Sequence, residues 1–150
     1  MISRVYIDTS VIGGCFDEEF AEWSNLLITQ IAKGLKIAVV SDITYQEIEL
    51  APEFVQRKLF DLPEVFIEMI TTSDETEFLA EQYIKAKAVT RKYYEDALHI
   101  ANATIHKVDV VASWNFKHLV NLDRIRKYNA VNLKEGYSFV DIRTPREITG

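Results

Sequence analysis

Four oxygen-bearing side chains lie far apart in the sequence, each where a predicted buried element begins or ends: Asp8, Glu47, Asp96 and Asn115. In an open parallel sheet, ligands bind at the carboxyl ends of the strands, and we expect these side chains to meet there. Clustered carboxylates are costly unless a cation neutralises them. Oxygen ligands of this kind favour Mg²⁺ or Mn²⁺. The positions therefore predict a site for a divalent metal ion.

Each position also has an ordinary structural explanation. Asp8 can cap a helix at the junction after a strand. Asp96 stands in the first turn of a predicted helix, where the helix dipole favours an acid by about 0.3–1 kcal/mol. Glu47 on its own is typical of a solvated helix surface, and Asn115 can close a turn. The joint order of the four residues, and no one of them alone, indicates chemistry.

Further side chains near these positions are candidates for support or substrate binding: Thr9, Ser10, His99, Ser113 and Asn115. The hydroxyls of Thr9 and Ser10 can orient Asp8 or hold a water or a phosphate oxygen. Ser113 points to the same side of its predicted strand as Asn115 and can donate to a neighbouring carboxylate. His99 can bind a substrate phosphate or lie beside the acids.

Short apolar, β-branched runs predict the strands that must position these residues. We expect strands over 3–8, 36–41, 65–71 and 108–113 and a late strand around 139–142, and helices over 17–33, 42–51, 53–60, 73–89, 93–107 and 122–127. A break is expected at Gly13-Gly14. Strands that alternate with helices predict an α/β fold with a mostly parallel sheet covered on both faces.

Composition limits the class of protein. A chain of 150 residues with 48% hydrophobic and 27% charged residues is typical of one globular domain. The net charge of −6 is unusual for a stand-alone nucleic-acid binder, which is commonly basic, but it does not exclude a nuclease. The lone Cys15, the absence of a signal-peptide pattern and the lack of an apolar run of ~20 residues favour a cytoplasmic protein outside the membrane.

The ordered segments resemble the PIN-domain family, and within it the VapC-like branch of toxin–antitoxin systems. The resemblance rests on residues 5–12, 43–48, 95–103 and 108–116. It implies a three-layer α/β/α sandwich, Mg²⁺- or Mn²⁺-dependent endoribonuclease activity, an antitoxin partner and a homodimer. By position, Asp8, Glu47 and Asp96 match the metal-binding acids of the family.

Asn115 departs from that pattern, because the family commonly carries a fourth acid there. One negative charge and one strong ligand are lost, and we expect one tightly held ion, with a second arriving with substrate. The alternative is a catalytically impaired PIN-like module that binds RNA or a protein partner. A phosphohydrolase with Asp8 as nucleophile is a third reading, but the second acid commonly found two residues later is replaced by Ser10.

Overall fold

Five parallel strands form the centre of the computed structural model, which describes residues 2–150. The strands are β1 (Ser3–Ile7), β2 (Lys36–Ser41), β3 (Ile67–Ile70), β4 (Val110–Ala112) and β5 (Ile142–Arg143). Their order across the sheet is β3-β2-β1-β4-β5, with β1 in the middle. All four neighbouring pairs are parallel, and the predicted α/β class with a parallel sheet is confirmed.

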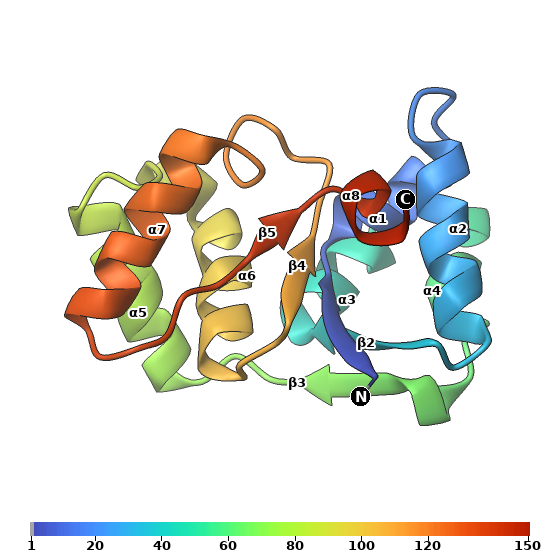
Figure 1. Ribbon diagram of the computed structural model, residues 1–150, viewed down its shortest axis with the longest axis horizontal. Coiled ribbons are helices and arrows are strands. Elements are labelled where there is room, and N and C mark those ends of the chain that lie inside the picture. Colours follow the sequence, from blue (N-terminus) through green and yellow to red (C-terminus); the bar gives the residue numbers. More distant parts are fainter. Residues whose placement is uncertain (1) are drawn as a thin grey trace.

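Helices cover both faces of this sheet (Figure 1). They are α1 (Thr9–Gly14), α2 (Ala21–Ala32), α3 (Asp42–Glu49), α4 (Glu53–Phe60), α5 (Asp74–Lys85), α6 (Tyr94–Ile105), α7 (Leu122–Lys134) and α8 (Pro145–Thr149). Short 3-10 turns occupy Glu64–Phe66 and Arg91–Tyr93. Side chains of α5, α6 and α7 pack against one face, and those of α1, α2 and α4 pack against the other.

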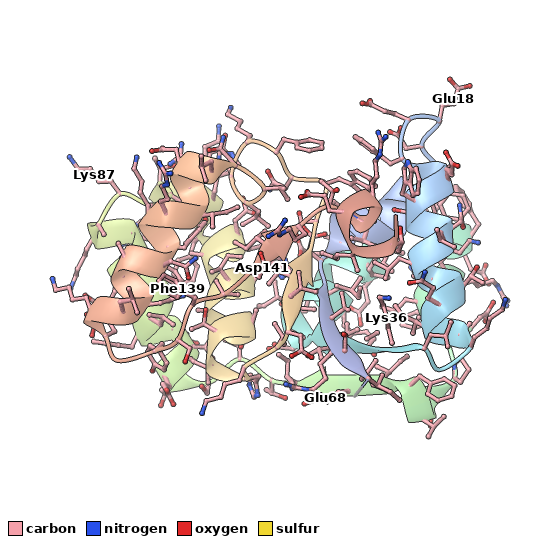
Figure 2. All side chains as sticks on the ribbon, viewed as in Figure 1. Glu18, Lys36, Glu68, Lys87, Phe139 and Asp141 are labelled. Atoms are coloured by element: carbon pink, nitrogen blue, oxygen red, sulfur yellow. The ribbon has the colours of Figure 1, made fainter. Side chains whose placement is uncertain are left out.

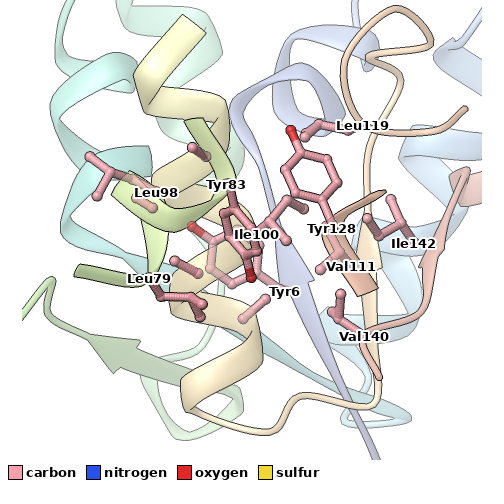
Figure 3. Close-up of a cluster of buried hydrophobic side chains, with 14 of the residues drawn as sticks. Tyr6, Leu79, Tyr83, Leu98, Ile100, Val111, Leu119, Tyr128, Val140 and Ile142 are labelled. Atoms are coloured by element: carbon pink, nitrogen blue, oxygen red, sulfur yellow. The ribbon is translucent and has the colours of Figure 1, made fainter. Parts of the chain in front are cut away.

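The alternation of side chains along β1 divides the buried residues into two cores. Tyr6 points into the core beneath α5, α6 and α7, which Figure 3 shows around Tyr83, Ile100 and Tyr128. Val5 and Ile7 point into the other core. Because both faces are covered, the strands are continuous apolar runs, and that property made them visible in the sequence.

The N-terminal helices differ from the prediction. The helix expected over 17–33 begins at Ala21, and a separate helix, α1, occupies residues 9–14, where a break was expected at Gly13-Gly14. Gly14 serves close packing, because a Cβ atom there would lie 2.8 Å from Nε1 of Trp114. The glycine pair is thus compatible with a helix end held tightly against a neighbouring side chain.

Three later boundaries also need correction. The helix that starts after Ser73 ends at Lys85, short of the predicted Val89, before Lys87 adopts the left-handed φ of 61°. Helix α7 continues from Leu122 to Lys134, beyond the predicted end at residue 127. The late strand is only Ile142–Arg143, and the helix α8 after it was not predicted. Across residues 2–150, no helix has both the length and the apolar character needed to span a bilayer.

Candidate active site

Three neighbouring strands deliver the candidate acids to one edge of the sheet. Asp8 follows β1 directly, and its Oδ1 accepts from the backbone N–H of Val11 at 3.3 Å, which caps α1. Ser41 ends β2 and caps α3, the helix that carries Glu47. Asn115 lies in the loop after β4. Because β1, β2 and β4 are adjacent and parallel, these residues all lie at the carboxyl edge of the sheet.

Asp8 is the most enclosed acid, with 4% of its surface exposed. Ser10 Oγ donates to Oδ1 at 2.6 Å, and Ser113 Oγ donates to Oδ2 at 2.5 Å. Burial raises the pKa of Asp8, while the charge of His99 and these hydrogen bonds favour the ionised form of Asp8 and act in the opposite direction. Two hydroxyls from separate segments thus fix both oxygens of one buried carboxylate.

Asp96 lies in the first turn of α6, close enough to the other acids to be repelled by them. Burial, followed by the charges of Asp8 and Glu47, raises the pKa of Asp96 to about 6. The charge of His99 and a side-chain hydrogen bond from Asn115 lower the pKa of Asp96 and partly offset this rise. The backbone N–H of Asn115 donates to Ser113 Oγ at 2.9 Å, which connects Asp96 to the hydroxyl that holds Asp8.

Glu47 is held by two donors on the same oxygen. His99 Nε2 lies 2.7 Å from Glu47 Oε1, and Thr9 Oγ1 donates to the same atom at 2.9 Å. Because a carboxylate only accepts, the proton of this bond belongs to His99 Nε2. Burial raises the pKa of Glu47, but the bonds from His99 and Thr9 outweigh it, and the net pKa is lowered.

His99 is buried among hydrogen-bonding groups, with only 2% of its surface exposed. Its Nδ1 lies 2.6 Å from the Tyr6 hydroxyl, which lies 2.7 Å from Ser41 Oγ. Burial lowers the pKa of His99, but the oxygens of Tyr6, Glu47 and Asp8 outweigh it and raise the pKa well above its usual value. Of the two roles predicted for His99, the position beside the acids is the one observed, since neither ring nitrogen faces solvent.

Sequence reasoning missed Tyr6 and Ser41 as members of this network. Tyr6 lies two residues before Asp8 on β1 and therefore faces the same side of the sheet, a signal available in the sequence. The partnership of Ser41 with Tyr6 joins positions 35 residues apart, and no local pattern could have shown it. The predicted site residues form two hydrogen-bonded sets, which interact with each other through their charges. One set contains Thr9, Glu47 and His99, and the other contains Asp8, Ser10, Asp96, Ser113 and Asn115.

The donor set suits a hard divalent cation, although the acids do not form a closed cage. Across residues 2–150, no three His, Cys, Asp or Glu side chains converge at metal-ligand range. Asp8 and Asp96 repel each other at close quarters, and a cation between them would relieve that repulsion. Glu47 is turned toward His99. The residues present therefore fit an ion held by the carboxylates of Asp8 and Asp96, with Glu47 at the edge of the ion site.

Comparisons with known proteins identify the family and the fold of the chain. The PIN-domain model matches residues 5–119. The fold is similar to VapBC2 from Rickettsia felis bound to a promoter DNA fragment, with a TM-score of 0.60, 15% identity, and coverage of 94% of this chain and 98% of that one. No curated protein sequence matches the chain.

Two further solved structures share the fold. A toxin–antitoxin complex from Klebsiella pneumoniae gives a TM-score of 0.56 at 17% identity, covering 76% of this chain and 88% of that one. FitAcB from Neisseria gonorrhoeae gives a TM-score of 0.53 at 16% identity, covering 95% and 98%. At these identities the likeness supports the fold alone.

Proposed function

Because the chain belongs to the PIN-domain family, whose members are generally nucleases, we propose that it is a Mg²⁺- or Mn²⁺-dependent endoribonuclease. The observation that carries the proposal is a pair of carboxylates at the carboxyl edge of the sheet, the buried Asp8 and the partly buried Asp96, whose charges repel each other. Such a pair raises the free energy of the folded chain unless positive charge is supplied. A bound divalent ion would supply that charge and would then attract the negatively charged phosphodiester.

The residues of the chain have distinct roles in this proposal. Asp8 and Asp96 would hold the ion, and Ser10 and Ser113 would fix both oxygens of Asp8. When bound, the ion supplies positive charge against a phosphodiester oxygen and makes a nearby water more acidic. Glu47, oriented by its two donors, would bind at the margin directly or through water.

Metal binding is the first test. We expect millimolar Mn²⁺ or Mg²⁺ to raise the melting temperature of the native chain and to leave that of Asp8→Asn unchanged, because ligand binding to the folded state stabilises it. Differential scanning fluorimetry with and without EDTA measures both values. Cleavage of single-stranded RNA should require the ion. Equal shifts of the melting temperature in the native chain and in Asp8→Asn would contradict the proposed metal site.

Asn115 tests the charge of the site. The Asn115→Asp variant places a fourth carboxylate next to Asp96. We expect it to melt at a lower temperature than the native chain in EDTA, because like charges repel, and to bind Mn²⁺ roughly tenfold more tightly, a change of about 1.4 kcal/mol. Calorimetric titration with Mn²⁺ gives the affinity. An unchanged or weaker affinity would exclude position 115 from the site.

A catalytically impaired module is the second candidate, favoured by Asn115 and by the lack of three convergent ligands across residues 2–150. It predicts RNA or protein binding with no cleavage in any divalent ion. The toxin role, a cytoplasmic location and a homodimer are also part of the proposal. The similar folds include toxin–antitoxin complexes, and we therefore infer an antitoxin partner.

A further inference from the structure

Charge is unevenly distributed along this acidic chain. Residues 85–134 hold ten Lys and Arg against four Asp and Glu, a net charge of +6. The remaining residues hold seven Lys and Arg against nineteen Asp and Glu, a net charge of −12. The total of −6 therefore conceals a basic segment, which includes the start of α6, the loop after β4 and the start of α7.

Contacts bring the parts of this segment together. The rings of Tyr93, just before α6, and His118, in the loop after β4, pack with centroids 3.8 Å apart. Arg124, at the start of α7, donates from Nη1 to the carbonyl of Ala88 at 2.9 Å. Lys92 Nζ lies 5.6 Å from the centroid of the Tyr93 ring. Three segments thus form one surface, defined here as the basic surface: Lys87, Lys92, Lys117 and Arg124.

The basic surface directly borders the candidate active site. The backbone N–H of His118 donates to Asn115 Oδ1 at 3.0 Å, and the same side chain hydrogen-bonds to Asp96. After burial, the charges of Lys117 and Arg124 lower the pKa of His118, in keeping with their closeness to its ring. Asn115 and His118 thus connect Asp96 to the basic surface.

The opposite side of the site is acidic. Asp17, Glu18 and Glu19 are exposed in the turn between α1 and α2. Phe20, which follows them, stacks on Trp114 with ring centroids 4.2 Å apart, next to Asn115. Figure 2 shows Lys87 at the upper left and Glu18 at the upper right, toward opposite ends of the long axis of the molecule. A polyanion at the site is therefore attracted on one side and repelled on the other.

The lysines of the basic surface are available for binding. Lys87, Lys92 and Lys117 are exposed, and none forms a salt bridge among residues 2–150. By contrast, the nearby Arg91 is paired with Glu81 at 2.8 Å. Cations without a carboxylate partner can neutralise phosphates at no cost in broken ion pairs.

We propose that phosphates of an RNA strand bind the basic surface and that the strand enters the active site from this side only. This inference rests on the proposed ribonuclease function and adds the path and direction of the substrate. It also explains how a chain with a net charge of −6 can bind a polyanion, because phosphate contacts depend on local charge.

The test compares two triple variants with identical net charge. Lys87→Glu/Lys92→Glu/Lys117→Glu reverses the basic surface, and the control, Lys33→Glu/Lys36→Glu/Lys134→Glu, changes lysines elsewhere. Fluorescence anisotropy with labelled single-stranded RNA in EDTA measures binding without cleavage. We expect at least tenfold weaker binding for the first variant and less than threefold for the control. The slope of log affinity against log salt should fall by about 2 for three lost phosphate contacts.

Equal losses in the two variants, or an unchanged affinity in the first, would overturn the proposal. Melting temperatures establish that both triple variants are folded. A milder variant of the basic surface, with the same three lysines changed to Gln, introduces no negative charge and should weaken RNA binding to an intermediate extent. Failure of the ribonuclease proposal gives a different result: the native chain would bind RNA through the basic surface and cleave none in Mn²⁺. If the native chain cleaves RNA in Mn²⁺ but has no affinity for RNA in EDTA at low salt, the proposed role of the basic surface is refuted and the ribonuclease proposal stands.

Discussion

Replacement of Asp8 by Asn is expected to reduce metal-dependent RNA cleavage at least about a thousandfold, a loss of about 4 kcal/mol of transition-state stabilisation. Asp8 is the acid whose two oxygens are both fixed, by Ser10 and Ser113, and it has the least exposure to water. An amide keeps the shape and the acceptor that caps α1 but loses the charge. Single-turnover cleavage of labelled RNA in Mn²⁺ measures the rate.

Asp96→Asn is expected to reduce cleavage by a similar factor without loss of the fold. Burial and the charges of Asp8 and Glu47 raise the pKa of Asp96 to about 6, above its usual value, so ionisation at higher pH costs folding free energy. The amide removes this cost, and we expect an equal or higher melting temperature in EDTA at pH 8. Below pH 4, where the native carboxyl is protonated as well, the difference should vanish.

At position 8, Asn is a better test substitution than Ala. Asp8→Ala would remove the repulsion between Asp8 and the neighbouring carboxylates, which favours the folded state. The structure shows that Ala would also remove the cap of α1, worth about 1 kcal/mol, and the acceptor for Ser10 and Ser113. Asp123→Asn, an exposed acid on α7, is the control. Cleavage that persists in Asp8→Asn and Asp96→Asn would contradict the assignment.

The position of the candidate site in the fold could be predicted from the sequence better than the contacts between the residues of that site. Strands β1, β2 and β4 are covered on both faces, so each is an apolar run whose end is visible in the sequence. Parallel neighbours must end at a common edge, and this places Asp8, Glu47 and Asn115 together without knowledge of any distance. Asp8 and Asn115 could therefore be chosen from strand ends, whereas Asp96 lies in the first turn of α6 and Glu47 lies within α3.

The boundaries of the helices and the hydrogen-bond partners of the site residues were harder to predict from the sequence. Helix α1 is only six residues long, and it ends at a glycine pair that normally indicates a break. Its position depends on the close approach of Trp114 to Gly14, a contact across 100 residues. The pairing of Glu47 with His99 likewise joins two helices, and no periodicity within either helix contains it. Long-range packing decided both features.

His99 is expected to act through Glu47, and its replacement should reduce cleavage 10- to 100-fold, the range typical of groups that orient metal ligands. The structure gives the reason: Nε2 donates to Glu47 Oε1, and the Tyr6 hydroxyl fixes the ring through Nδ1. A side chain with a donor at the Nε2 position should therefore retain most activity, whereas one without it should not. Gln can place its amide nitrogen near that position, while Leu has no donor.

The pair His99→Gln and His99→Leu separates positioning from packing, because both fill most of the buried volume of His99. We expect His99→Leu to lower kcat and the affinity for Mn²⁺ with little change in KM for RNA, since Glu47 loses its orientation while the basic surface is untouched. His99→Gln should stay within about tenfold of the native rate. Tyr6→Phe removes only the hydroxyl that contacts Nδ1 of His99, and its kcat should lie between those of His99→Gln and His99→Leu. If Gln and Leu lower kcat equally at matched melting temperatures, the donor at Nε2 has no role in cleavage and His99 serves only the packing of α6.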